Sequence, residues 1–284
     1  MKTTVTFLCL LLTSFLGFAE VTVSEKEALL KFYESTNGKD WKITWDLNQP
    51  VQKWYGITVE SDKVIAIDLP NNNLSGVLPA EMTQLVHLKR INLFKNNITG
   101  SLPASIGNLT SLTDLNLGFN QLTGQIPATI GQLTSLESME LFMNQLSGSL
   151  PSTVGQLKNL KVLSLFNNQL EGELPKSLYQ LKGLTELLLS SNQFTGKLSY
   201  EIENLKNLEN LSLFENNFMG QVPFELEKLT ALKEMNISYN QFNGITSHAL
   251  ASKDTFQLTM LNDKGVAYRL PLLTDNTGLV GTPD

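Results

Sequence analysis

The sequence predicts an α/β solenoid, in which similar coils stack along one parallel β-sheet. A 24-residue pattern repeats without insertion from Val64 to Thr255, and self-similarity at such a period is typical of repeat architectures. Each coil carries apolar residues at its fourth and sixth positions around a variable residue, the alternation of a short half-buried strand. We therefore expect eight 24-residue coils with one strand each. They start at Val64, Leu88, Leu112, Leu136, Leu160, Leu184, Leu208 and Leu232.

The composition narrows the classes of protein. The chain has 284 residues, of which 42% are hydrophobic, which is enough for a sizeable core. It carries 21 Lys and Arg against 27 Asp and Glu, and so lacks the basic excess that nucleic-acid binding needs. The single cysteine, Cys9, lies within residues 1–19, a predicted export signal. We therefore expect no nucleic-acid partner, no disulfide and no cysteine metal site.

Residues 1–19 resemble an export signal. Lys2 gives a positive start, a mostly apolar stretch runs from Val5 to Phe18, and small residues surround a cleavage point before Glu20. No later segment reaches the roughly 18 to 20 apolar residues that a membrane span needs. We expect the mature chain to be secreted or held at a cell surface by another component.

Two coil positions never vary. The ninth is always Asn, whose amide can donate to carbonyls and accept from N–H groups that the turning backbone leaves unpaired. The thirteenth is always Gly, from Gly76 to Gly244, as expected where the backbone turns tightly or approaches the next coil. Both positions predict scaffold roles. The asparagines are Asn72, Asn96, Asn120, Asn144, Asn168, Asn192, Asn216 and Asn240.

The third coil, LTDLNLGFNQLTGQIPATIGQLTS, resembles the plant-type leucine-rich repeat family, whose coil reads LxxLxLxxNxLxGxIPxxLGxLxx. The resemblance covers residues 64–245 closely. It implies a right-handed leucine-rich repeat superhelix with a parallel, concave β-sheet, and a recognition role, since relatives serve as receptor ectodomains and as inhibitors of wall-degrading enzymes. Ser199 departs from the pattern by replacing a Pro. In the eighth coil Thr246, Ser247 and Lys253 depart from it as well, so this coil degenerates towards a cap.

An N-terminal cap is predicted for residues 20–63, before repeats that occupy residues 64–255. A capping box over Ser24–Glu27 opens a predicted amphipathic helix, and Asn37-Gly38 ends it. The segment around Trp54 resembles the cap of plant-type receptors, with Gln52 and Val59 in place of its two cysteines. Without a disulfide, we expect Trp41, Trp45 and Trp54 to fill the core of this cap.

A C-terminal cap and tail are predicted for residues 256–284. Residues 255–261 and 266–270 alternate apolar and polar side chains around Asn262-Asp263-Lys264-Gly265, which is typical of a β-hairpin. We expect this hairpin to close the core below the eighth coil. The residues from 272 onwards show little periodicity and predict a loose tail.

The candidate binding surface lies at coil positions 3, 5, 7 and 8, whose side chains point out of the sheet onto the concave face. Aromatic residues recur there beside mostly acidic ones, which favours a partner with a cationic stretch over a polyanion. In the other interpretation, the rings stack on one another and only shield the sheet. The predicted partner-binding residues are Phe94, Phe119, Glu140, Phe142, Met143, Phe166, Phe214, Glu215 and Tyr239.

The sequence offers no catalytic constellation. His87 and His248 occupy a variable position and the degenerate coil, and we find no Gly-rich phosphate loop or metal cluster. We therefore predict a non-enzymatic recognition module, without cofactor or metal, that binds a protein or peptide, or a glycan. One alternative is an inhibitor of a foreign hydrolase. Another is an ice-binding or structural protein that uses hydroxyls at position 12, although Glu171 and Met219 interrupt them.

Overall fold

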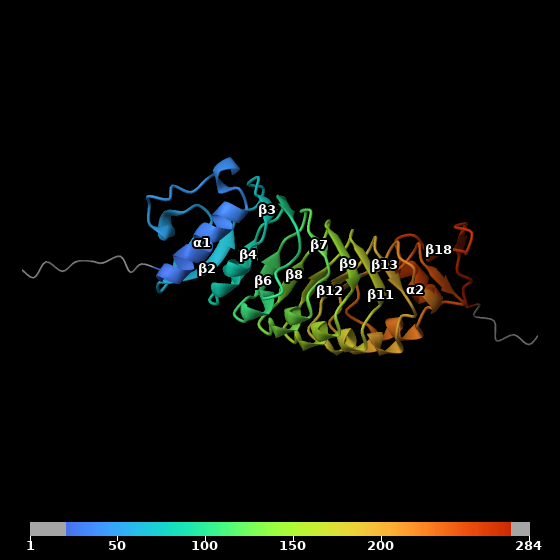
Figure 1. Ribbon diagram of the computed structural model, residues 1–284. Helices are drawn as coiled ribbons and strands as arrows, with labels where there is room; N and C mark the ends of the chain where they lie inside the picture. Colours follow the sequence, from blue (N-terminus) through green and yellow to red (C-terminus); the bar gives the residue numbers. More distant parts are fainter. Residues whose placement is uncertain (1–20, 274–284) are drawn as a thin grey trace, which may run out of the picture.

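The computed structural model describes residues 21–273, which form one elongated stack of coils (Figure 1). A nine-stranded sheet runs along the stack, and its last eight strands are parallel. Each residue pairs with the one 24 positions later, as Leu163 does with Leu187. The predicted solenoid is confirmed. The parallel strands are β2 (Lys63–Asp68), β4 (Arg90–Asn92), β6 (Asp114–Asn116), β8 (Ser138–Glu140), β10 (Val162–Ser164), β12 (Glu186–Leu188), β14 (Asn210–Ser212) and β16 (Glu234–Asn236).

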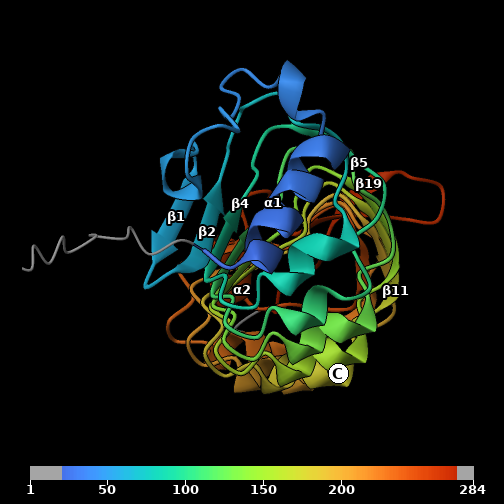
Figure 2. The ribbon, with the colours of Figure 1, turned by 60° about the vertical axis from the view of Figure 1, so that its left-hand side comes forward.

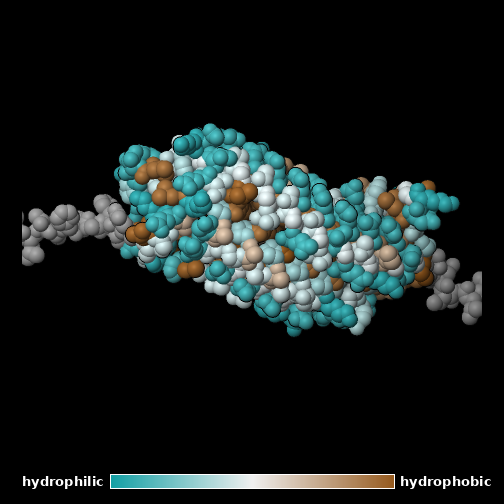
Figure 3. Space-filling view, in the orientation of Figure 1, coloured by the Kyte–Doolittle hydropathy of each residue, from teal (hydrophilic) through white to brown (hydrophobic). Residues whose placement is uncertain are grey.

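Each coil continues from its strand through a second short strand. These second strands pair in parallel as β3-β5, β7-β9-β11-β13 and β15-β17. Figure 2 shows them on the right, opposite the nine-stranded sheet. The face of the molecule seen in Figure 3 carries many hydrophilic residues and scattered apolar patches. They are β3 (Ser75–Val77), β5 (Asn97–Thr99), β7 (Thr123–Gly124), β9 (Gln145–Ser149), β11 (Gln169–Glu173), β13 (Gln193–Thr195), β15 (Met219–Gln221) and β17 (Gln241–Asn243).

A short 3₁₀ helix then completes seven of the coils. These helices gather along the lower side of the stack (Figure 2), and Pro precedes most of them at the N-cap, where its missing N–H costs nothing. Their bounds are η3 (Ala80–Gln84), η4 (Ile106–Asn108), η5 (Ala128–Gln132), η6 (Ser152–Gln156), η7 (Lys176–Gln180), η8 (Tyr200–Asn204) and η9 (Phe224–Lys228).

The missing Pro at Ser199 has a local explanation. Ser199 has a backbone N–H that a proline would lack, and this group donates to the hydroxyl of Tyr179 over 3.4 Å. Tyr179 lies where earlier coils carry a glycine such as Gly155, and its side chain is buried. Burial raises the pKa of Tyr179 to about 12, because the charged phenolate would lose its hydration. The two departures from the repeat therefore compensate each other.

The invariant asparagines form a buried ladder, as predicted. Nδ2 of Asn144 donates to the carbonyl oxygens of Leu117 and Leu141, each over 3.0 Å. Its Oδ1 accepts from the backbone N–H of Leu122 over 2.9 Å. Each amide thus ties together two turns of backbone, and leaving such buried groups unpaired costs about 1 to 3 kcal/mol each. The thirteenth-position glycines have left-handed φ values, +76° at Gly148 for example, which confirms their role in the turn.

The N-terminal segment, residues 21–62, begins with helix α1 (Val23–Ser35). Its capping box joins Thr22 and Glu25, so the box expected at Ser24–Glu27 is wrong by two residues. The reason lies outside the helix, because the Glu25 carboxylate also accepts from the backbone N–H of Val64 over 3.2 Å. That contact with the first coil fixes Glu25 at the third helical position.

The three tryptophans of this segment are buried, as expected. Trp45 stacks on Trp54 with ring centroids 4.7 Å apart and meets Trp41 edge-on at 4.9 Å. Each indole N–H also donates to a backbone carbonyl, which satisfies its one polar atom. The segment further contains η1 (Gly38–Asp40), η2 (Val51–Lys53) and β1 (Ile57–Glu60), and β1 pairs antiparallel with β2.

At the other end lies helix α2 (His248–Lys253), followed by the predicted hairpin of β18 (Thr259–Leu261) and β19 (Ala267–Arg269). The backbone N–H of Leu261 donates to the Asn240 carbonyl over 2.7 Å, so the hairpin covers coil eight. The residue boundaries of both caps remain a prediction. The predicted export signal and residues 274–284 lie outside the described residues. Within residues 21–273, no helix has the length and apolar character of a membrane span.

Candidate binding surface

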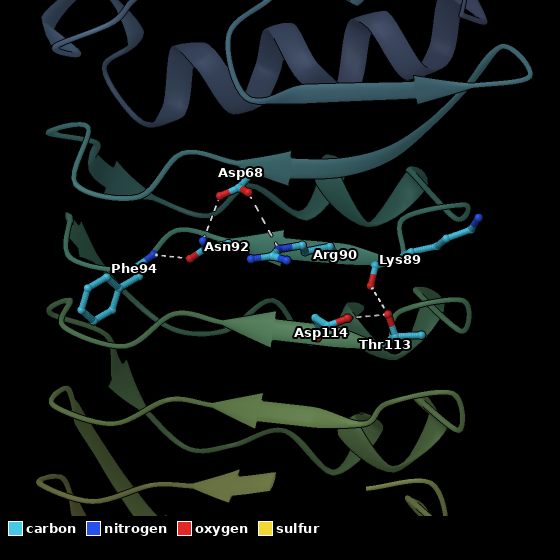
Figure 4. A network of polar contacts seen from close by, with 7 residues as sticks. All are labelled: Asp68, Lys89, Arg90, Asn92, Phe94, Thr113 and Asp114. Atoms are coloured by element: carbon cyan, nitrogen blue, oxygen red, sulfur yellow. Dashed lines mark hydrogen bonds and ion pairs between the residues drawn. The ribbon is translucent and has the colours of Figure 1, made fainter. Parts of the chain in front are cut away.

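The solvent-facing side of the nine-stranded sheet, called the sheet face below, begins with a polar network (Figure 4). Nδ2 of Asn92 donates to Asp68 over 2.8 Å, and its Oδ1 accepts from the backbone N–H of Phe94 over 3.2 Å. The guanidinium of Arg90 lies 3.9 Å from the same Asp68 carboxylate. On the next strand, the Thr113 hydroxyl donates to Asp114 over 2.6 Å. Asp68 therefore offsets the charge of Arg90, one of the three basic residues at the start of coil two with Lys89 and Lys95.

The first aromatic cluster comprises Phe94, Phe119, Phe142 and Phe166, from coils two to five. Phe142 and Phe166 stack with ring centroids 4.6 Å apart and an interplanar angle of 10°. Phe119 meets Phe94 edge-on at 5.7 Å and Phe142 at 6.1 Å. The sequence predicted that these four residues lie together, and the structure confirms it.

A second aromatic cluster comprises Phe214, Tyr239 and Phe256 at the C-terminal end of the sheet face. The rings of Phe214 and Tyr239 lie 5.1 Å apart, and Phe256 stacks on Phe214 at 5.2 Å. Sequence reasoning missed Phe256, because it follows α2 and falls outside the repeat.

The aromatic residues of the predicted binding surface are only partly exposed, and they do not form a continuous row. Of the predicted aromatic residues only Phe119 is exposed, with 40% of its surface accessible. The others are half-buried, because neighbouring rings cover them: Phe94, Phe142, Phe166, Phe214 and Tyr239. Coil six carries Ser190 and Ser191 in place of large side chains. The aromatic residues of the predicted surface therefore form two clusters that flank a gap, rather than one continuous row.

Residues at position 8 have a backbone conformation that sequence reasoning missed. Phe119, Met143, Glu215 and Tyr239 all have φ between +52° and +57°, a region that non-glycine residues rarely enter. Hydrogen bonds between coils hold them there, such as the Met143 N–H to the Phe166 carbonyl over 2.8 Å.

Acidic side chains remain in excess along this face. Lys161 pairs with Glu137 at 2.6 Å and Lys233 with Glu209 at 2.5 Å. Among the described residues, no ion pair involves four other carboxylates of the sheet, which accept at most a hydroxyl hydrogen bond. The face therefore carries net negative charge from coil four to coil eight. These carboxylates belong to Glu140, Glu186, Glu215 and Glu234.

A groove of about 500 Å³ opens where the two clusters are interrupted. Phe166 and Met143 line one side and Glu215 the other, with Ser191 between them. A second hollow of about 520 Å³ lies near the C-terminal hairpin, beside His248 and Arg269. His87 and His248 are exposed and lie in different coils. Residues 21–273 contain no group of three His, Cys, Asp or Glu residues placed to hold a metal ion.

Family models recognise the repeats. A model described as leucine-rich repeat region matches residues 141–255, and one described as leucine rich repeat matches residues 87–109 and 111–133. Together they cover more than half of the chain. The matches to the family expected from the coil pattern therefore extend from coil two to coil eight.

Three known proteins are similar to this chain in sequence or structure. A probable inactive leucine-rich repeat receptor-like protein kinase of Arabidopsis thaliana is 34% identical over 90 residues, 30% of this chain and 13% of the relative. The Arabidopsis receptor kinase HAESA ectodomain, solved with an N-terminally extended IDA peptide hormone ligand, is 28% identical with a TM-score of 0.69, over 84% of this chain and 40% of that one. The chain thus spans less than half the length of either receptor-type relative.

A crystal structure of a plant ice-binding protein is similar to this chain over most of its own length. It is 24% identical with a TM-score of 0.57, over 80% of this chain and 89% of that one. At this identity the likeness shows the fold alone. From the repeats, the family models and these relatives, the chain is a member of the leucine-rich repeat family, of the plant type.

Proposed function

We propose that this chain is an extracellular, non-enzymatic recognition module that binds a peptide or protein on its sheet face. The observation that carries the proposal is the pair of aromatic clusters, whose rings lie at positions free of scaffold duty. The invariant asparagines and the buried leucines supply the scaffold without them. The similarity of the chain to a receptor ectodomain solved with a peptide hormone supports the same class of partner.

The charge of the sheet face supports a partner with a cationic stretch. The unpaired carboxylates, Glu140 and Glu215 among them, lie beside the rings rather than apart from them. Exposed charges contribute only about 0.2 to 1 kcal/mol each, so they set the association rate more than the lifetime of a complex. Central aromatic residues are the usual hot spots, at about 2 kcal/mol or more. We therefore expect the rings to supply the affinity.

The experiment begins with capture of the partner from the native extracellular medium. Its affinity is then measured for the Phe142→Ala/Phe166→Ala double variant and for Gln125→Ala, an exposed control outside the sheet face. We expect the double variant to stay folded and to bind at least about 30-fold more weakly. A folded double variant with the affinity of the control would mean that the rings only shield the sheet.

The alternatives predict different observations. A hydrolase inhibitor would use the same surface, and the captured partner would be an enzyme that loses activity in the complex. A glycan partner would survive protease treatment of the captured material. Ice binding has less structural support, since the Thr99 hydroxyl already donates to the Gly76 carbonyl over 2.9 Å. Thermal hysteresis in a solution of the purified chain would reveal it.

A further inference from the structure

The groove in the sheet face arises from a local change in the repeat. Coils four and five carry Phe142 and Phe166 at the seventh position, whereas coil six carries Ser190, followed by Ser191. Ser191 lines a hollow of about 500 Å³ between Phe166 of coil five and Glu215 of coil seven. A gap of one coil places its two walls two strand spacings apart, about 10 Å.

The wall on coil five is an aromatic ring with one free face. Phe142 stacks on Phe166 from the coil-four side, nearly parallel at 10°. The opposite face of the Phe166 ring is therefore directed towards coil six, where Ser190 is too small to cover it. A free ring face attracts a cation, and most strongly where water is partly excluded.

The opposite wall carries a carboxylate. Glu215 lines the groove, and its Oε2 accepts from the Ser191 hydroxyl over 2.7 Å, which orients the side chain. Within residues 21–273 it makes no ion pair with a lysine or arginine. The groove therefore combines a ring face and an oriented anion at opposite ends of a slot.

We infer that this groove receives an arginine side chain of the peptide partner, a step that rests on the proposed function. The guanidinium stacks on Phe166 and donates to the Glu215 carboxylate. Arginine suits the slot better than lysine, because its planar group stacks on rings and donates in a fork to a carboxylate. The amides of Asn167 and Gln193 also line the groove and offer acceptors for the remaining N–H groups.

The test selects binders from a displayed pool of random dodecapeptides on the purified chain. The affinity of the selected peptides is then measured for Ser190→Phe, which places a ring on the coil-six side of Phe166. Coils two, four, five and seven already accommodate a phenylalanine at this position. Glu215→Gln removes the charge and keeps the shape. The matched control is Glu234→Gln, an exposed carboxylate of the sheet outside the groove.

We expect selected peptides to share an arginine, and to bind both groove variants about tenfold more weakly while binding the control normally. Replacing that arginine by citrulline should cost the same factor. Peptides that bind without an arginine, or that bind both groove variants as well as wild type, would overturn the inference and leave the proposed function standing. Failure to select any peptide that binds at the sheet face would count against the proposed function itself. If Ser190→Phe unfolds, Glu215→Gln and Phe166→Leu decide the question.

Discussion

The two ends of the solenoid solve the same problem with different chemistry. Each end must cover the leucine core and satisfy backbone groups that a further coil would have satisfied. At the N-terminal end the cover is aromatic, because Trp41, Trp45 and Trp54 pack with Phe32 and Tyr33. At the C-terminal end the centre of the cover is a buried carboxylate.

That carboxylate belongs to Asp254, which is only 4% exposed. It accepts from the Ser238 hydroxyl and the Ile237 N–H over 2.6 Å each, and from the N–H groups of Phe256 and Leu258. Four donors thus converge on one side chain. The comparison teaches that the N-terminal end depends on filled volume, whereas the C-terminal end depends on one acceptor.

The sharpest way to break the N-terminal end is Trp45→Ala. Trp45 lies at the centre of the ring cluster, so its removal leaves a cavity that neighbouring rings cannot fill. We expect a loss of about 3 to 5 kcal/mol in the free energy of unfolding, measured by urea denaturation. The exposed Tyr55→Ala is the control. A loss below about 1 kcal/mol would mean that the aromatic cover is dispensable.

At the C-terminal end the corresponding change is Asp254→Asn, which keeps the volume. The amide presents an NH₂ group to donors that the carboxylate accepts, and so leaves buried N–H groups unpaired. We expect a loss of about 2 to 3 kcal/mol in the same assay, with Asp263→Asn in the exposed turn as the control. Equal stability of the two variants would contradict the polar closure.

Between the ends, Asn144→Ala tests the scaffold that both caps protect. It removes an amide that makes several buried hydrogen bonds, and we expect a loss of at least about 1 kcal/mol. The neighbouring Gln145→Ala is exposed and should change little. A denaturation midpoint within error of wild type would count against the asparagine ladder.

The smallest effect at neutral pH is expected for Tyr179→Phe, in the middle of the stack. The raised pKa of Tyr179, about 12, means that its neutral form is stabilised by folding. That contribution is complete below pH 10 and is lost as the pH rises towards 12. Wild type should therefore lose about 2 kcal/mol more than the variant across this window. Parallel pH profiles of stability for the two proteins would show that Tyr179 is not the group responsible.

Sequence periodicity was sufficient to predict the repeat. It failed for residues that act once, or whose contacts join the repeat to the segments that flank it. The coil register and the asparagine ladder follow from residues that recur every 24 positions, and the hairpin follows from apolar and polar alternation around a turn. The capping box was misplaced because a contact from Glu25 to Val64, far along the chain, decides the register of α1. Asp254 and Phe256 gave no periodic signal, because each acts once.

The candidate site was predictable only in part. The sequence placed the aromatic residues on one face, but ring stacking decides how much of each remains exposed. The left-handed backbone at position 8 had no signal either, since ordinary residues such as Met143 occupy it. Ser191 lines the groove between Phe166 and Glu215, but in the sequence it looks like ordinary variation at its coil position.

The central claim, binding on the sheet face, is tested most directly by oxidative footprinting of the chain with and without its bound partner. Phe119 and Met143 report on the sheet face, while Phe224 and Met219 report on the other sides of the stack. The two phenylalanines are a matched pair, since each is 40% exposed. We predict that the partner slows oxidation of Phe119 and Met143 and leaves Phe224 and Met219 unchanged. Protection of Phe224 and Met219, with Phe119 and Met143 still oxidised at the free rate, would contradict the account.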